Sequence, residues 1–276
     1  MNQKFYLTSL LGALLLTGIY SVLDTLLGFG FAWGNSLWAL LSNFLVALIL
    51  ACYIVNSHRS GFRLGLEVFL IYFIIGHFNI LIEAYIFNVT TRSQTMLELL
   101  RGLLAALAFS PVFTSMMQHQ NNRQPRPLPG RSVLSWAWRV FASDTLYLFC
   151  YLSAGIVLSI LYPRLLTFYE GKLPAMGTMI ATQFFLRGLI FTGVALLMLQ
   201  STTLPLFRKA VLIGITFSVL GGIAPLIPPN ELMPAFVRLG HGLEVGISNF
   251  LFGLLIAFLL GYGAGTKTKA SKAELS

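Results

Sequence analysis

Long apolar runs of about 20 residues alternate with short polar connections along nearly the whole chain. Eight such runs cover residues 7–29, 36–55, 64–87, 97–117, 140–162, 176–199, 209–227 and 237–262. A helix rises by about 1.5 Å per residue, so each run is long enough to cross a hydrocarbon core about 30 Å thick. The pattern predicts an all-α, polytopic membrane protein with eight transmembrane helices.

The first apolar run could alternatively be a secretory signal peptide, because Gly30-Phe31-Ala32 has small residues at the spacing of a cleavage site. The apolar region of a signal peptide is about 7 to 15 residues long, whereas this run is about twice as long and contains Asp24. We therefore expect the first run to be retained as a membrane span. The other seven spans do not depend on this choice.

The composition also fits a bilayer environment. Of the 276 residues, 57% are hydrophobic and 10% are charged, and the mean hydropathy is +0.80. Such a chain could hardly cover a water-soluble surface. The net charge of +9 does not indicate a nucleic-acid partner, since the cations form no basic stripe interleaved with aromatic residues. Cys52 and Cys150 lie inside apolar runs and lack the spacing of a zinc site or a disulfide framework.

Lys and Arg are distributed unequally between the two sides of the predicted membrane. The two ends and every second connection carry twelve of them, and the remaining connections carry three, which are Arg92, Arg164 and Lys172. Loops rich in Lys and Arg stay in the cytoplasm. We therefore expect both termini to be cytoplasmic, in a multi-pass protein of the cell membrane, which is the inner membrane if the chain is bacterial. Membrane lipids are then its immediate partners.

The connection 118–139 contains Q-H-Q-N-N-R-Q-P-R-P-L-P-G-R and predicts a polar cytoplasmic linker. It separates a first four-helix group, 1–117, from a second, 140–262. Residues 263–276 are small and Lys-rich, which predicts a disordered cytoplasmic tail. The short sequences D-T-L, L-R-G-L and G-L-E-V each occur in both groups. They pair different spans, so they do not by themselves predict an internal repeat.

Polar residues inside the third run are candidates for function, because such groups are costly in lipid and normally face a bundle interior, a cavity or one another. Asn79 and Glu83 are four residues apart and share a helical face with Tyr72. His77 lies about 120° away from Glu83 on the same helix. An ionised Glu83 would need a cationic partner.

Two other runs carry matching groups. Arg187 lies near the middle of the sixth run, and His241 and Glu244 are three residues apart on one face of the last run, with Ser248 one turn beyond. Depths counted from the ends of the runs place most of these groups in the extracytoplasmic half of the membrane. We predict a substrate-binding site there, built from Arg187, His77, Asn79, Glu83, His241 and Glu244.

Three interpretations of this site remain open. The preferred one is a transporter or membrane receptor that holds a small anionic or polar ligand on Arg187 while the histidines and carboxylates titrate. The second is a membrane-embedded enzyme acting on a lipid or lipid-linked substrate, in which histidines and glutamates bind zinc or iron, or His77 and His241 bind haem. The third is a structural or assembly subunit. The sequence leaves any cofactor unknown.

The segment T-Q-F-F-L-R-G-L-I-F, Thr182 to Phe191, resembles the first motif of the CAAX-protease and bacteriocin-processing family of membrane proteins. In that family a pair of glutamates precedes the arginine by about four residues. This chain has Thr182 and Gln183 at those positions, and its next span lacks the F-x-x-x-H of the family. Since the missing carboxylates are the groups that would activate water, the resemblance does not imply protease activity here.

Overall fold

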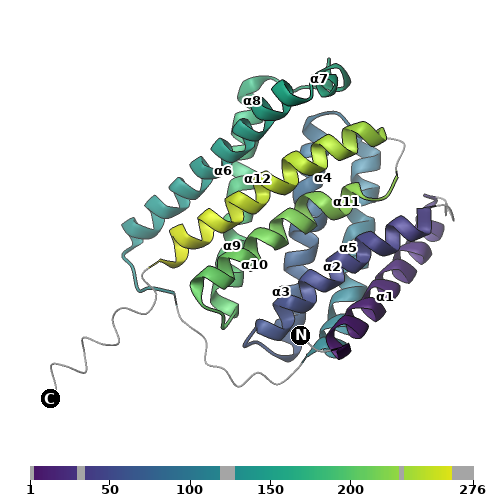
Figure 1. The fold of residues 1–276 in the computed structure, drawn as a ribbon, viewed down its shortest axis with the longest axis vertical. Coiled ribbons are helices and arrows are strands. Elements are labelled where there is room, and N and C mark those ends of the chain that lie inside the picture. The colour runs from purple at the N-terminus through teal and green to yellow at the C-terminus, as the bar shows by residue number, and fades with distance from the viewer. Residues whose placement is uncertain (1–2, 30–34, 119–127, 230–232, 263–276) are drawn as a thin grey trace.

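The computed structural model describes residues 3–29, 35–118, 128–229 and 233–262, and within these ranges the chain forms helices and no strands. Eight units in them are long and apolar enough to cross a membrane, and we number them span 1 to span 8 (Figure 1). Five of them are single α-helices, and each of the other three is interrupted by a π-helical segment. In chain order they are α1 (Gln3–Leu27); α2 (Ser36–Asn56); α3 (Gly61–Phe73), η2 (Ile74–Phe78) and α4 (Asn79–Ile86); α5 (Arg92–Met117); α6 (Val133–Leu161); α8 (Met176–Thr182), η3 (Gln183–Gly188) and α9 (Leu189–Ser201); α10 (Leu206–Ser218), η4 (Val219–Ile223) and α11 (Ala224–Leu226); and α12 (Ala235–Gly261).

Large apolar side chains cover the outside of the bundle as well as its core. Leu26, Ile160 and Leu239 are among many that are exposed, while Phe109, Phe217 and others fill the interior. A bilayer makes such a surface favourable because the acyl chains are as apolar as the side chains. The eight helices are therefore compatible with an integral, multi-pass membrane protein.

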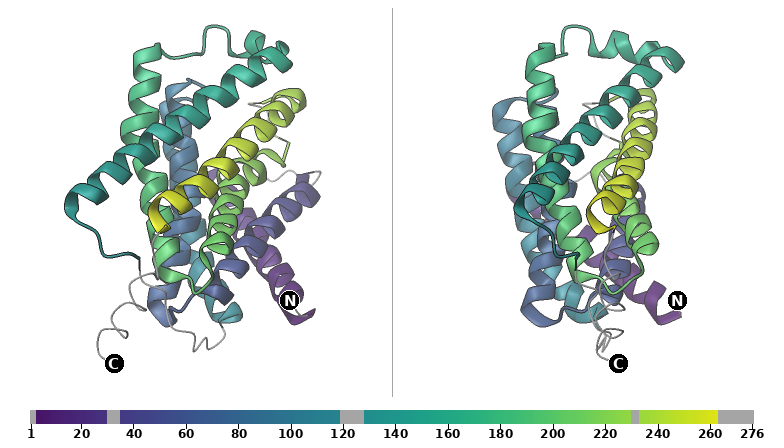
Figure 2. Two further views of the ribbon diagram at one scale, coloured as in Figure 1. Left: turned by 60° about the vertical axis from the view of Figure 1, so that its left-hand side comes forward. Right: turned by 90° about the vertical axis from the view of Figure 1, so that its left-hand side faces the viewer.

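α1 begins and α12 ends at the same end of the bundle, which we call the terminal face. The short helix α7 (Arg164–Tyr169), between spans 5 and 6, lies at the opposite end (Figures 1 and 2). α6 and α12 run obliquely beside each other from the α7 end toward the terminal face (Figure 2). The first residues of α12 thus lie close to α7.

The order in which the helices pack is repeated in the two halves of the chain. Span 1 packs against spans 2 and 4, and span 3 against span 4; correspondingly, span 5 packs against spans 6 and 8, and span 7 against span 8. The contacts between the halves follow the same rule, since span 2 meets span 7 and span 6 meets span 3. Of the short sequence repeats, D-T-L relates spans 1 and 5 as the packing does. Asp24 lies near the end of α1, however, and Asp144 in the first half of α6, so the two are not equivalent.

Two contacts lie where the halves meet. The π segments η2 and η4, from spans 3 and 7, pack against each other. At the terminal face, the chain after α2 and the chain after α9 form an antiparallel bridge between Ser57 and Thr202, with hydrogen bonds from His58 N to Ser201 O and from Thr203 N to Asn56 O. The halves are therefore joined through equivalent parts of each.

The predicted spans agree with the helices except at several ends. α6 starts at Val133, so residues 133–139, which were expected to belong to the linker, are helical. α5 starts at Arg92 rather than 97, because Thr91 and Gln94 form a capping box that the apolar pattern does not register. The cleavage-like sequence at 30–32, residues 119–127 of the linker and the 263–276 tail lie outside the described residues.

Candidate functional site

Arg187 lies inside η3, in the middle of span 6, and only 2% of its side-chain surface is exposed. Its Nη1 lies 2.7 Å from Glu83 Oε2 and donates a hydrogen bond of 3.1 Å to Gln183 Oε1. Its Nε donates a hydrogen bond of 3.1 Å to Asn79 Oδ1. A buried guanidinium is tolerated only when it is paired and its donors are satisfied, and these three side chains supply that environment.

The π segments explain why these groups meet. A π segment places one extra residue in a helical turn, which rotates the residues that follow by about 100°. Asn79 and Glu83 lie on α4 immediately after η2, and Gln183 and Arg187 lie at the first and fifth positions of η3. A regular helix would place Tyr72 on the same face as Asn79 and Glu83. Because Tyr72 precedes η2, it lies on a different face, and that part of the prediction was wrong.

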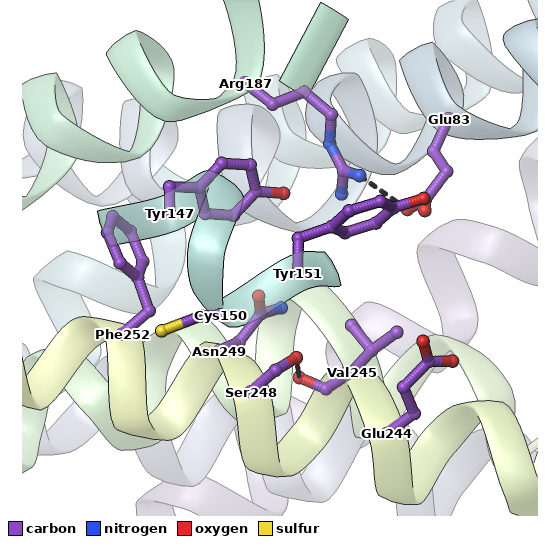
Figure 3. Close-up of a pocket in the computed structure, with 10 residues that line it drawn as sticks. All are labelled: Glu83, Tyr147, Cys150, Tyr151, Arg187, Glu244, Val245, Ser248, Asn249 and Phe252. Carbon is purple, nitrogen blue, oxygen red and sulfur yellow. Dashed lines mark hydrogen bonds and ion pairs between the residues drawn. The ribbon is translucent and has the colours of Figure 1, made fainter. Parts of the chain in front are cut away.

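The guanidinium of Arg187 borders a small cavity between spans 3, 5, 6 and 8 (Figure 3). The volume of the cavity is about 10 Å³, roughly the least that holds one water molecule. Among the described residues, no hydrogen bond involves Nη2 of Arg187, and Figure 3 shows this nitrogen turned toward the cavity. The cavity is lined by Glu83, Tyr147, Cys150, Tyr151, Arg187, Glu244, Val245, Ser248, Asn249 and Phe252.

Aromatic rings form one wall of the cavity. Cζ of Arg187 lies 5.8 Å from the centre of the Tyr147 ring, within the range of a cation–π contact. The Tyr147 ring in turn packs against Phe191 and Phe252, with centroids 5.1 and 5.0 Å away. This apolar wall keeps water away from the Arg187–Glu83 pair on the side of the bundle core.

The opposite wall carries a second carboxylate. Glu244 Oε2 lies 3.0 Å from His241 Nδ1, so the two form a hydrogen-bonded pair within one turn of α12. Asn249, on the same helix, donates to the carbonyl oxygens of Phe217 and Gly221 at 3.4 Å each and so ties α12 to the start of η4. Glu244 and Asn249 therefore face the cavity from a helix that also holds span 7 in place.

α7 covers the outer end of this region. The Tyr169 ring lies 6.4 Å from the His241 ring and 6.1 Å from the Phe87 ring. Burial raises the pKa of the Tyr169 phenol, and the carboxylates of Glu83 and Glu244 raise it further. Tyr169 thus stays a neutral hydroxyl beside the two carboxylates.

Of the six residues predicted to form one site, the structure brings five into this region and separates His77 from it. Arg187, Glu83 and Glu244 line the cavity, Asn79 holds Arg187, and His241 holds Glu244. Sequence reasoning had not assigned Tyr147, Tyr151, Asn249 or Gln183 to the site. Gln183 could have been found, since it precedes Arg187 by four residues and so lies on the same side of a helix.

His77 belongs to a different group, which we call the Arg101 cluster. Its Nε2 is 2.9 Å from the Tyr20 hydroxyl, which is itself 2.8 Å from the Tyr72 hydroxyl. The guanidinium of Arg101 lies over the Tyr20 ring at 4.7 Å and binds Asp24 through two hydrogen bonds of 2.5 and 2.9 Å. Glu98 completes the cluster with a bond of 3.1 Å to Arg101. The His77 side chain therefore packs between spans 1, 3 and 4.

The positions of the two polar groups correspond. Glu98 and Arg101 lie six and nine residues after the start of α5, and His241 and Glu244 lie six and nine residues after the start of α12. Spans 4 and 8 are equivalent in the repeated packing. In the first half the pair is closed by Asp24, whereas in the second half Glu244 faces the cavity.

The structure offers little for a metal. Among residues 3–29, 35–118, 128–229 and 233–262, no three His, Cys, Asp or Glu side chains come together. His241 and Glu244 supply two ligand types, and Glu83 is already bound to Arg187.

Comparison with known proteins gave no match: no family model, no curated protein and no solved structure is similar to this chain. A function therefore has to be argued from the geometry of the chain itself.

Proposed function

We propose that the chain is a multi-pass membrane protein that binds and transports a small polar solute at the cavity beside Arg187. The observation that carries the proposal is the convergence of Arg187, Glu83 and Glu244 on one cavity from spans 6, 3 and 8. Each of these groups is costly to bury in a membrane, and packing alone requires none of them. In this proposal the distribution of Lys and Arg puts both termini in the cytoplasm, and the cavity then lies in the extracytoplasmic half.

The pairing within the site narrows the chemistry of the solute. Glu83 neutralises Arg187, and Glu244 adds a second negative charge that a protonated His241 would balance. The four groups together carry a charge of zero or minus one, with no surplus positive charge for a free anion. The site therefore favours a neutral or cationic solute that donates hydrogen bonds to Glu244 and accepts one from Nη2 of Arg187.

The volume of the cavity fits a closed state. A space for about one water molecule cannot hold a solute, so binding requires spans 5 and 8 to move apart. The contact between these spans is sparse at Gly155 of α6, because this residue lies near Glu244 Oε1 and has no side chain to pack against it. Separation there would open the cavity and free Glu244.

Thermal-shift screening of the purified protein tests this function. The panel contains amines, amino acids, sugars and small carboxylates, and we expect stabilisation by a member with hydrogen-bond donors that is lost in Glu244→Gln. The matched control is Glu98→Gln, the same change at a carboxylate of the Arg101 cluster in the equivalent span 4, which should keep the response. A stabilising compound that both variants still bind, or a panel in which only anions stabilise the protein, would refute the proposal. Chemical conversion of the bound compound would instead identify an enzyme.

A further inference from the structure

Asp144 is a buried carboxylic acid that the site described above does not use. It lies on α6, about one turn closer to the terminal face than Tyr147, and is 4% exposed. Its Oδ1 has no hydrogen-bond partner among the described residues. The hydroxyl of Thr192, on α9, lies beside it and likewise has no partner by hydrogen-bond geometry. These two polar groups, each without another partner among the described residues, thus lie side by side between spans 5 and 6.

Gly188 allows this approach. A Cβ atom at position 188 would lie 2.8 Å from Asp144 Oδ1, closer than real Cβ contacts, and 3.2 Å from Asp144 Cα, closer than most of them. Gly188 is the last residue of η3 and follows Arg187 directly. The absence of a side chain therefore lets the Asp144 carboxyl group rest against the segment that carries Arg187.

No charged group compensates Asp144. On α6, Arg139 donates to Leu259 O, while Tyr147 and Cys150 are uncharged when protonated. On η3, Arg187 is paired with Glu83, and α9 faces Asp144 with Thr192, which does not ionise. An ionised carboxylate without a partner is very costly in a low-dielectric interior, whereas a protonated one costs far less.

We propose that Asp144 is a proton-binding site, whose carboxyl group keeps its proton in the folded protein to a higher pH than a free Asp side chain does. Release of that proton would create a charge against Gly188 and thereby disturb η3 and the position of Arg187. Proton release at Asp144 would then be coupled to opening of the cavity. The coupling rests on the proposed transport function, whereas proton binding by Asp144 does not.

The dependence of stability on pH tests proton binding. Free Asp side chains ionise near pH 4, so the unfolded chain loses this proton at a lower pH than the folded protein. The stability contributed by protonated Asp144 is therefore present at low pH and declines as the pH rises. We expect the thermal midpoint of the wild type, relative to that of Asp144→Asn, to fall as the pH rises above about pH 4 and to level off once the folded protein has lost the proton. Parallel curves for the two proteins would overturn the proposal.

Glu67 provides the matched control. It also lies toward the terminal face, but it accepts a hydrogen bond of 2.7 Å from Tyr53 and pairs with Arg59 at 3.4 Å. Because its carboxylate has both a hydroxyl and a cation as partners, Glu67 is the partnered counterpart of Asp144.

A second measurement uses the wild-type protein alone and does not depend on how a variant folds. Dicyclohexylcarbodiimide reacts with protonated carboxyl groups in apolar surroundings, and peptide mass mapping locates the adduct. We expect Asp144 to be modified near neutral pH and Glu67 to be spared. Modification of Glu67 without Asp144 would overturn proton binding, and screening hits lost in Glu244→Gln would leave the proposed function standing in that case.

Discussion

Arg187 determines how the polar residues of the site are arranged. The five N–H donors of a guanidinium cannot be hidden in a membrane without partners, and Glu83, Asn79 and Gln183 together accept from two of its three nitrogens. The remaining nitrogen faces the cavity (Figure 3). One side of the guanidinium therefore serves the fold, and the other is available to a ligand.

The strength of the Arg187–Glu83 pair can be measured with a double-mutant cycle. Glu83→Gln leaves the buried guanidinium without its counter-charge, and we expect a loss of about 3–5 kcal/mol in the free energy of unfolding. Arg187→Gln should also destabilise the protein, and the double variant should lose less than the two single losses together, with a coupling of about 0.5–3 kcal/mol. Denaturant unfolding in mixed micelles provides the measurement. Additive losses would show that the pair is not coupled.

At the scale of single residues, the sequence predicts which polar side chains are costly to bury in a membrane, but not which of them contact one another. The expense of placing Arg187 and Glu83 in a membrane is visible from their positions in apolar runs, and the structure brings them together. The assignment of His77 to the same site was not supported, because its side chain turns to Tyr20. The angular position of His77 depends on η2, and the apolar pattern does not reveal where a π segment interrupts a helix.

Individual helices approach one another through small residues. Gly253 of α12 lies against Gly214 of α10, and a Cβ atom at position 253 would be 2.7 Å from Gly214 Cα and 2.9 Å from its N. Both nearest atoms belong to the backbone, so a side chain there could not be accommodated by a rotamer change. The separation of spans 7 and 8 is fixed by this contact.

We expect Gly253→Ala to destabilise the protein by about 1–3 kcal/mol because it forces α10 and α12 apart. Gly193→Ala is the matched control: position 193 is also inside a span, nothing lies within 4 Å of its Cβ position, and alanine is the better helix former. The control should be neutral or more stable. Equal losses in the two variants, measured by unfolding in micelles, would contradict the role of close approach.

The helices themselves were largely predictable, because an apolar run of about 20 residues has few alternatives in a membrane. Their ends were less so. The extension of α6 back to Val133 passes through polar residues, Ser135 and Arg139 among them, whose partners lie on other segments; Arg139, for example, donates to Leu259 O. Partners distant in the chain cannot be inferred from a local pattern.

The repeated packing of the two halves explains why the molecule has two polar groups at similar positions. Spans 1, 3 and 4 enclose the Arg101 cluster, and spans 5, 6 and 8, with span 3, enclose the Arg187 site. The first group is closed by an Asp–Arg pair, and the second retains a cavity. Under the proposed function, the first half supports the bundle, and the second half binds the solute together with Glu83 of span 3.

The orientation of the whole molecule gives the last prediction. In the sequence, the two ends and every second connection carry twelve Lys and Arg residues, whereas the remaining connections, among them the one that contains α7, carry three, so the α7 side should be extracytoplasmic. In a chain with Cys52 and Cys150 replaced by alanine, we expect Glu170→Cys, exposed after α7, to react with a membrane-impermeant maleimide in intact cells. Ser60→Cys, exposed after α2, should react only after lysis. The reverse result would place the cavity in the cytoplasmic half, and labelling of both in intact cells would contradict the crossing of spans between them.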